Sequence, residues 1–186
     1  MWLRMRKKVN EIFYSLQGEG YHTGTPAVFV RLSGCNLSCP FCDTRHDEGV
    51  MMTDDEIVEA CLRHPARMVV VTGGEPSLQL DDALVNAFHS AGFRVHVETN
   101  GTMPLPASVD WVTCSPKTGG EVVLTHIDEL KVEYEGQDLS QYDCYDAAHR
   151  FLQPCSCLNT DATIAAVLAH PAWRLSLQTH KLVGIR

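Results

Sequence analysis

Short apolar segments recur along the chain, and most of them end in a polar cluster. Amphipathic patterns between them predict helices over 53–64, 80–93 and 158–171. Apolar strands that alternate with helices are typical of parallel sheets, which bind ligands at the carboxyl ends of their strands. We therefore expect an α/β fold whose site gathers the clusters TGGEP, ETNG, SPK, QPCS and QTHK. The predicted strands cover residues 27–32, 68–72, 93–99, 111–115, 127–133, 150–154 and 173–179.

The length and charge of the chain limit its number of domains and its binding partners. Its 186 residues fit a single domain spanning residues 1–186. A net charge of −8 provides no basic field that would attract nucleic acid or an anionic membrane. No apolar run has the length of a membrane span, and neither Met1 nor the alternative start Met5 opens a signal peptide. We expect a cytoplasmic protein that acts on a small molecule.

The cysteines suggest a metal centre. Eight cysteines in a reducing cytosol favour metal binding, catalysis or buried thiols over disulfides. Cys35, Cys39 and Cys42 fall within SGCNLSCPFCDT, residues 33–44. They form a zinc site with His46, three buried thiols, or a [4Fe–4S] cluster with one iron left open. The other cysteines are expected to be buried thiols, although the last two form a C-x-C pair: Cys61, Cys114, Cys144, Cys155 and Cys157.

The C-x3-C-x2-C spacing resembles the signature of the radical S-adenosylmethionine (SAM) enzymes. A second motif, TGGEP at residues 72–76, follows the next strand, as the family's loop for the amino group of SAM does. The resemblance implies a [4Fe–4S] cluster that cleaves SAM to a 5′-deoxyadenosyl radical. Gly73 and Gly74 let the main chain approach a ligand closely, while Glu75 either receives an ammonium group or holds the loop.

Further segments resemble the 7-carboxy-7-deazaguanine synthases, radical SAM lyases of queuosine and 7-deazapurine biosynthesis. The resemblance implies conversion of 6-carboxy-5,6,7,8-tetrahydropterin to 7-carboxy-7-deazaguanine, with ring contraction and loss of ammonia. It also implies a Mg²⁺ ion on the substrate carboxylate, and SAM that is regenerated in each turnover. The matching segments are EIFYSLQGEG (11–20), FVRLSGCNLSCPFCDT (29–44), VVVTGGEP (69–76), VETNGT (97–102), SPK (115–117), ELK (129–131), FLQP (151–154) and RLSLQTHK (174–181).

The resemblance also implies the site residues. Cys35, Cys39 and Cys42 would hold the cluster, Thr44 would bind Mg²⁺, and no protein side chain beyond the cluster and SAM is needed for catalysis. The implied substrate contacts are Leu16, Gln17, Gly18, Arg31 and Thr72, of which Arg31 suits a carboxylate. The implied SAM contacts are Gly74, Ser115, Pro116, Lys117, Gln153, Pro154, Cys155 and Ser156. Weaker candidates at strand ends are Glu98, Thr99, Asn100 and His180.

Two short intervals depart from longer family members. The stretches from Cys42 to Thr53 and from Lys117 to Glu129 are compact, so we expect an incomplete, open parallel (β/α) barrel of radical SAM type, trimmed of some helices. Its sheet edges would be covered in a homodimer. In some relatives the C-terminal carboxylate reaches the substrate, and Arg186 ends this chain.

Alternatives to this function remain open. A glycyl-radical activating enzyme is similar in size and cluster motif, and a zinc or iron–sulfur module without catalysis would use the same cysteines. The synthase reading implies an electron donor such as flavodoxin or ferredoxin, and a product that enters tRNA modification or a secondary metabolite.

Overall fold

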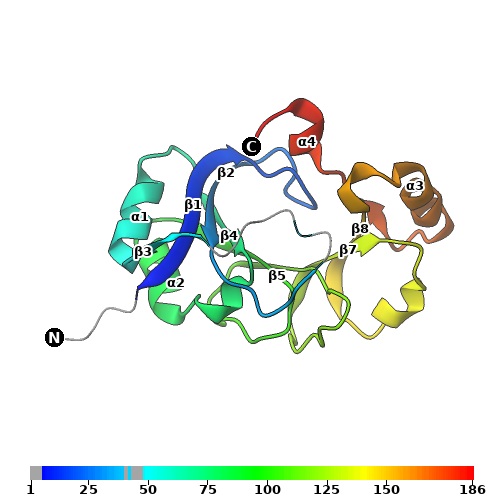
Figure 1. The fold of residues 1–186 in the computed structure, drawn as a ribbon, viewed down its shortest axis with the longest axis horizontal. Coiled ribbons are helices and arrows are strands. Elements are labelled where there is room, and N and C mark those ends of the chain that lie inside the picture. The colour runs from blue at the N-terminus through cyan, green and yellow to red at the C-terminus, as the bar shows by residue number, and fades with distance from the viewer. Residues whose placement is uncertain (1–5, 40–41, 43–47) are drawn as a thin grey trace.

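The structure is a computed structural model that describes residues 6–39, 42 and 48–186. Within these residues the strands form one nine-stranded sheet in the order β3-β1-β2-β4-β5-β6-β7-β8-β9. Figure 1 shows α1 and α2 beside one end of the curved sheet and α3 beside the other. The strands are β1 (Lys7–Leu16), β2 (Pro26–Leu32), β3 (Val50–Met52), β4 (Met68–Gly73), β5 (Arg94–Thr99), β6 (Trp111–Cys114), β7 (Ile127–Tyr134), β8 (Ala147–Pro154) and β9 (Arg174–Leu175). The α-helices are α1 (Asp54–Leu62), α2 (Asp82–Ser90), α3 (Thr160–Ala169) and α4 (Thr179–Val183).

The sheet is parallel over most of its width. From β2 through β9 every neighbouring pair is parallel, whereas β1 pairs antiparallel with both β2 and β3. The two ends of the strand order do not meet, so the sheet is an open, partial barrel. This confirms the predicted fold class.

Three parts of the sheet differ from the sequence prediction, and the first is the short strand β3, which was not predicted. Strand β1 was not predicted, because KKVNEIFYSL mixes charged and apolar residues on both faces. The predicted strand 173–179 was mostly wrong, since β9 ends at Leu175 and α4 begins at Thr179. The Ser176 N–H still donates to the Leu152 carbonyl oxygen of β8 (2.8 Å), but the Thr179 N–H donates to the Gly18 carbonyl oxygen (2.9 Å), so the chain has left the sheet by Thr179.

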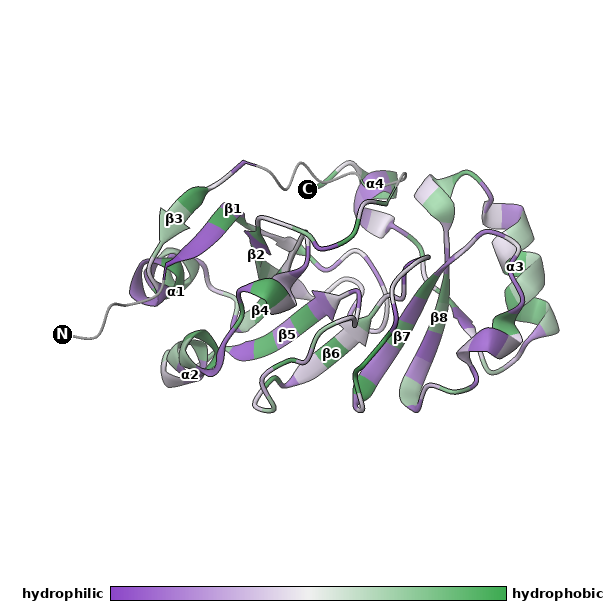
Figure 2. Cartoon of the chain, turned by 60° about the horizontal axis from the view of Figure 1, so that its bottom comes forward, coloured by the Kyte–Doolittle hydropathy of each residue, from purple (hydrophilic) through white to green (hydrophobic). Residues whose placement is uncertain are grey.

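Hydrophilic and hydrophobic residues alternate along several strands (Figure 2), which places them on opposite faces of the sheet. Outward-facing residues of β2, β4 and β5 pack against α1 and α2, and those of β7 and β8 pack with residues of α3. The inner face of the middle strands carries polar residues instead, at Thr72, Glu98, Thr113, Lys131 and Gln153. The interior of the half-barrel thus holds a polar cavity at the carboxyl ends of the strands, whereas nearer their amino ends it is packed by the rings of His22, His96, Trp111 and His149.

The predicted helices form with local signals at their ends. Thr53 caps α1 in the predicted capping box, in which its hydroxyl accepts from the Glu56 N–H and the Glu56 carboxylate accepts from the Thr53 N–H. Asp81 caps α2, and Gly92 follows that helix with a φ of +82°. Among the described residues, none of the helices combines the length and the apolar character needed to span a bilayer.

Coil replaces a helix between β6 and β7. Residues 115–126 contain no helix in the structure, as expected from the compact interval after Lys117. Val122 and Leu124 from this coil pack in the same apolar cluster as Cys114 of β6, which is fully buried. The coil therefore covers apolar surface that a helix would cover in a complete barrel.

Candidate functional site

One cavity of about 280 Å³ opens at the carboxyl ends of the parallel strands. Of the predicted site residues, Thr44 lies outside the described residues and Pro116 does not line the cavity. The residues on either side of Pro116, Ser115 and Lys117, do line the cavity. The structure brings the remaining predicted residues together around this cavity: Leu16, Gln17, Gly18, Arg31, Cys35, Cys39, Cys42, Thr72, Gly74, Ser115, Lys117, Gln153, Pro154, Cys155 and Ser156. The weaker candidates Glu98, Thr99, Asn100 and His180 line it as well.

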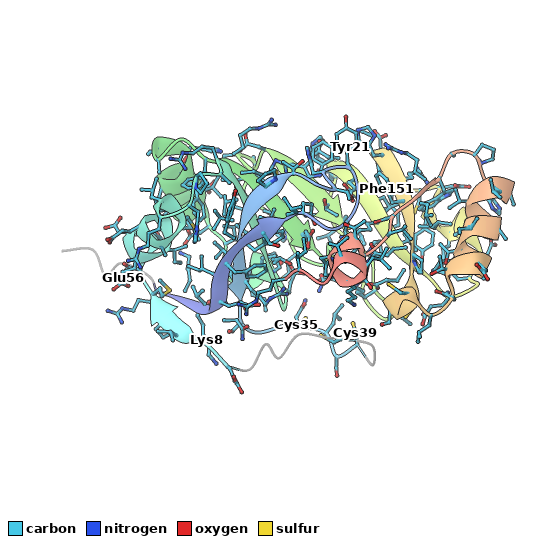
Figure 3. The ribbon with its side chains drawn as sticks, turned by 90° about the horizontal axis from the view of Figure 1, so that it is seen from above. Lys8, Tyr21, Cys35, Cys39, Glu56 and Phe151 are labelled. Atoms are coloured by element: carbon cyan, nitrogen blue, oxygen red, sulfur yellow. The ribbon has the colours of Figure 1, made fainter. Side chains whose placement is uncertain are left out.

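The three cysteines of the cluster loop face the same cavity. Cys35 and Cys39 are half-buried, Cys42 is exposed, and all three are free thiols. Figure 3 shows Cys35 and Cys39 at the edge of the molecule where α4 also lies. Burial raises the pKa of the Cys39 thiol; Lys117 opposes this rise, and the neighbouring thiols Cys35 and Cys42 add to it. The three thiols therefore open onto one cavity.

The chemistry of these thiols fits the cysteine ligands of a [4Fe–4S] cluster, because all three are free and line one cavity. A [4Fe–4S] cluster places each thiolate on a different iron, so its ligands stand further apart than those of zinc. His46, the fourth ligand of the zinc hypothesis, lies outside the described residues. The donor set in the cavity thus fits three cluster ligands and an open iron.

The two glycines of TGGEP let the loop approach the cluster loop. A Cβ atom at Gly73 would lie 2.0 Å from the Leu32 carbonyl oxygen, and one at Gly74 would lie 2.0 Å from that of Gly34. The Glu75 N–H donates to the same Gly34 oxygen at 2.8 Å. Only glycine allows this contact, because both partners are main-chain atoms that cannot move aside.

Glu75 holds the loop and is not a lining residue of the cavity. Its side chain is fully buried. One carboxylate oxygen accepts from the Ser77 N–H (2.9 Å), the Ser77 hydroxyl (2.6 Å) and the Thr99 hydroxyl (2.6 Å), and the other accepts from the Asn100 N–H (2.7 Å). Of the two roles considered for Glu75, the geometry supports the structural one.

Hydrogen bonds continue from this carboxylate to the cluster loop. The Asn100 amide donates to the Asn36 side-chain oxygen (3.0 Å), and the Asn36 amide donates to the Thr102 hydroxyl (2.8 Å). The Thr102 hydroxyl in turn donates to the Asn100 oxygen (2.7 Å). The strand ends of β4 and β5 are thereby tied to the residue that follows Cys35.

A buried lysine lies at the floor of the cavity. Lys131 donates to Glu19 at 2.5 Å and lies 3.6 Å from Glu98. Burial would lower the pKa of Lys131, but the carboxylates of Glu19, Glu98 and Glu129 raise it. Burial alone would raise the pKa of Glu19, yet the charge and hydrogen bond of Lys131 lower it to about 2. Burial raises the pKa of Glu129.

Glu98 connects this floor to two predicted substrate contacts. Its carboxylate accepts from the Gln17 amide at 3.0 Å and from the Thr72 hydroxyl at 3.2 Å. Glu19, Lys131 and Gln178 were not among the predicted site residues. The alternation of charged residues in IDELKVE could have placed Lys131 on the inner face of β7.

The C-terminal helix contacts the loop that carries Gln17. The Thr179 N–H and hydroxyl both donate to the Gly18 carbonyl oxygen, each at 2.9 Å. A Cβ atom at Gly18 would lie 2.3 Å from Nδ1 of His180. This close approach fixes His180 at the wall of the cavity.

Comparison with known proteins assigns the family. The model of the radical SAM superfamily matches residues 29–135. The 7-carboxy-7-deazaguanine synthase of Bacteroides thetaiotaomicron is 64% identical over 182 residues, which cover 98% of this chain and 100% of that protein. The chain belongs to this family. Its membership of the radical SAM superfamily implies a [4Fe–4S] cluster and SAM as cofactors.

Other members of the family agree in fold and differ in length. The synthase of Bradyrhizobium diazoefficiens is 43% identical over 211 aligned positions, covering 98% of this chain and 100% of the relative. Because 211 positions exceed the 186 residues of this chain, that relative carries additional segments. A crystal structure of QueE from Escherichia coli superposes with a TM-score of 0.80 at 31% identity, covering 94% of this chain and 95% of that one.

Proposed function

We propose that the chain converts 6-carboxy-5,6,7,8-tetrahydropterin to 7-carboxy-7-deazaguanine, as a carbon–nitrogen lyase that releases ammonia. One observation carries the proposal: the three cysteines of the radical SAM motif open onto the same polar cavity as the predicted pterin contacts, in a chain 64% identical to a named synthase. No observation favours the activating-enzyme alternative or the non-catalytic module.

The cavity residues divide by the chemistry they offer. Cys35, Cys39 and Cys42 would hold the cluster, whose bound SAM supplies the radical that abstracts hydrogen. Gly74 lets the main chain approach a ligand beside the cluster loop. The implied SAM contacts lie at the carboxyl ends of β6 and β8 and in the segments that follow them: Ser115, Lys117, Gln153, Pro154, Cys155 and Ser156.

The substrate contacts lie on the other side of the cavity. Arg31 offers a guanidinium for the substrate carboxylate, while Gln17 and Thr72 are bound to Glu98 and so are fixed in orientation. The side chains present oxygen and nitrogen groups that match the amide and amine edge of a pterin. Leu16 and Gly18 complete that wall.

Several finer points belong to the same proposal. Mg²⁺ would bind through Thr44, because a hydroxyl oxygen suits a hard cation that also takes the substrate carboxylate. A one-electron donor of the flavodoxin or ferredoxin type would reduce the cluster. We also propose a single domain over 1–186, a homodimer that covers the short edge strands β3 and β9, and a cytoplasmic location that keeps the cluster thiols reduced.

The experiment is anaerobic reconstitution with iron and sulfide, followed by addition of SAM, a reductant, Mg²⁺ and 6-carboxytetrahydropterin. Mass spectrometry should detect 7-carboxy-7-deazaguanine from the native protein and from Cys144→Ala, because Cys144 is exposed and does not line the cavity. Cys39→Ala should give none.

Two other results would change the assignment. If 5′-deoxyadenosine forms without the deazaguanine, the radical chemistry stands and the substrate is wrong. If a protein with a full cluster forms neither compound, the proposed function is wrong. Omission of Mg²⁺ should reduce the rate, and an unchanged rate would remove Thr44 from the metal site.

A further inference from the structure

The C-x-C pair of Cys155 and Cys157 is a cysteine motif that the proposed function leaves partly unused. The expectation that the cysteines outside the cluster motif are buried thiols is correct for Cys61 and Cys114, which are fully buried. It is wrong for Cys144, which is exposed, and for the pair, whose two residues are partly exposed. Burial raises the pKa of Cys61 and Cys114 to about 12, so these two thiols are inert. The pair instead combines proximity in the chain with access from solvent.

The main chain between the two thiols is left-handed without a glycine. Ser156 has φ and ψ angles of 47° and 30°, and Cys157 has a φ of 62°. Two successive non-glycine residues rarely adopt this region, because each Cβ atom then crowds the following carbonyl oxygen. Hydrogen bonds hold the turn: the Cys155 N–H donates to the side-chain oxygen of Asn159 (2.9 Å), and the Leu158 N–H donates to the Cys155 carbonyl oxygen (2.9 Å). The strain therefore lies at and beside the residue that separates the thiols.

This turn brings the Cα atoms of the two cysteines into the range of a disulfide. A left-handed helical turn has the dimensions of a right-handed one, with about 3.6 residues per turn, a rise of about 1.5 Å and a Cα radius of about 2.3 Å. Over two residues these values give a Cα–Cα distance of about 5.4 Å. Disulfides join Cα atoms that are about 4.4–6.8 Å apart. Because Ser156 lies close to this conformation, the Cα separation in the turn allows a bond between Cys155 and Cys157.

The turn is also open to small reagents. The 3₁₀ turn η3, Cys155–Cys157, contains no buried residue. The next side chain, Leu158, is 89% exposed. A small disulfide in solution can therefore reach this turn without unfolding of the chain.

Both thiols are connected to the wall of the cavity. Cys155 lines the cavity itself. The Cys157 thiol donates to Oε1 of Gln178 at 3.7 Å, and the Gln178 amide donates to Glu19 at 2.9 Å. Gln178 and Glu19 line the cavity as well. A change in the bonding of the pair therefore reaches the cavity by two routes, directly through Cys155 and indirectly through Gln178.

We propose that Cys155 and Cys157 form a thiol–disulfide modification site whose oxidation weakens SAM binding. One cysteine thiolate attacks a small disulfide and displaces its first thiolate, and the second cysteine then displaces the other thiolate. The two protons of the pair pass to the displaced thiolates, so one small disulfide is reduced to two thiols while an Sγ–Sγ bond forms. The disulfide does not depend on the proposed function, whereas its effect on SAM rests on the SAM contacts of that proposal.

Oxidation removes what the reduced pair supplies to the cavity. The Cys155 sulfur turns from the cavity toward Cys157, and the Cys157 sulfur loses the hydrogen that it donates to Gln178. Ser156 lies between the bonded residues, so its position in the cavity wall changes with them. By linkage, SAM that binds the reduced form more tightly must oppose formation of the disulfide by the same factor.

The first test maps the disulfide by mass and requires no activity. The reconstituted holoenzyme is treated anaerobically with glutathione disulfide, alkylated and digested with trypsin. Cleavage after Arg150 and Arg174 releases peptide 151–174, whose two cysteines are the pair. This peptide should become lighter by two hydrogen atoms and escape alkylation, and added SAM should slow the change. Cys144, on the preceding peptide 132–150, is the internal control, because its single thiol can take up glutathione but cannot form a bond within its peptide.

The second test measures equilibrium binding of SAM to the holoenzyme without reductant. Oxidation should weaken SAM binding roughly five- to tenfold, as expected for the loss of one or two polar contacts, and dithiothreitol should restore it. Cys157→Ser keeps a hydroxyl that can donate to Gln178, so it should bind SAM as the native protein does, both before and after oxidation. Cys144→Ser is the matched control and should lose affinity on oxidation as the native protein does. The iron content, measured in each sample, shows that the cluster remains intact.

Three results would overturn the inference. The first is a pair that stays fully alkylated at a glutathione disulfide concentration that modifies Cys144. The second is a disulfide that leaves the affinity for SAM unchanged. The third is an equal loss of affinity in oxidised Cys157→Ser, which would assign the effect to another thiol. Failure of the proposed function would look different, because the disulfide would form and weaken SAM binding while the reduced holoenzyme produced no deazaguanine.

Discussion

Replacement of Glu75 by alanine tests whether one buried carboxylate holds the SAM-side loops in place. The carboxylate accepts four hydrogen bonds of 2.6–2.9 Å, from Ser77, Thr99 and Asn100, and its side chain is fully buried. Each buried donor left without an acceptor costs about 1–3 kcal/mol. A water molecule that enters the space can satisfy about two of the four donors, so the two that remain should cost roughly 2–6 kcal/mol.

The assay is thermal unfolding of the native protein and the variant, monitored by circular dichroism. For a chain of this length, 1 kcal/mol corresponds to about 2–4 °C in Tm, so Glu75→Ala should lower Tm by roughly 4–24 °C. The Tm of Glu75→Gln should lie between those of the native protein and Glu75→Ala. The glutamine amide keeps one acceptor oxygen but directs its NH₂ group at a donor. Glu135→Ala, at an exposed position, is the control and should change the free energy of unfolding by under about 0.5 kcal/mol. A loss in Glu75→Ala no larger than that of the control would refute the argument.

Three further substitutions test close contacts and buried charge. Gly74→Ala should prevent cluster assembly, measured as bound iron and sulfide, because its Cβ atom would lie 2.0 Å from a main-chain oxygen of the cluster loop; a full iron content would contradict this. Gly18→Ala should lower Tm through its 2.3 Å approach to the His180 ring, and His180→Ala in the same chain should restore most of the loss, because only the 2.9 Å contact with the His180 Cβ then remains. Lys131→Met should destabilise the fold by about 3–5 kcal/mol at pH 7, since it leaves buried carboxylates unpaired. Because the folded-state pKa of Glu19 is about 2, below its ordinary 4.5, the native protein should lose roughly 3 kcal/mol of stability as pH falls from about 4.5 toward 2, and acid titration of Lys131→Met should not show this loss.

The parallel part of the fold could be predicted from local patterns. β4 is a continuous apolar run, and β5 alternates between apolar and polar residues, so both strands are specified by a few neighbouring residues. The capping box at Thr53 specifies the start of α1 in the same way. The position of the cavity could be predicted as well, because the carboxyl ends of parallel strands lie at the same edge of a sheet.

The remaining elements depend on partners that are distant in sequence. Lys7 is only 2% exposed, and its position in β1 is explained by ion pairs with Asp54 (3.2 Å) and Asp81 (2.6 Å). Lys131 binds Glu19, a residue 112 positions away. Helix α4 forms where a strand was predicted, since a short apolar run is ambiguous until its tertiary contacts are known.

The coil between β6 and β7 serves two faces of the sheet at once. Its first residues, Ser115 and Lys117, line the cavity, and Lys117 donates to Ser115 at 2.9 Å. A few residues later, Val122 and Leu124 cover Cys114 on the outer face. One short stretch of main chain therefore supplies both a wall of the cavity and a patch of the outer packing.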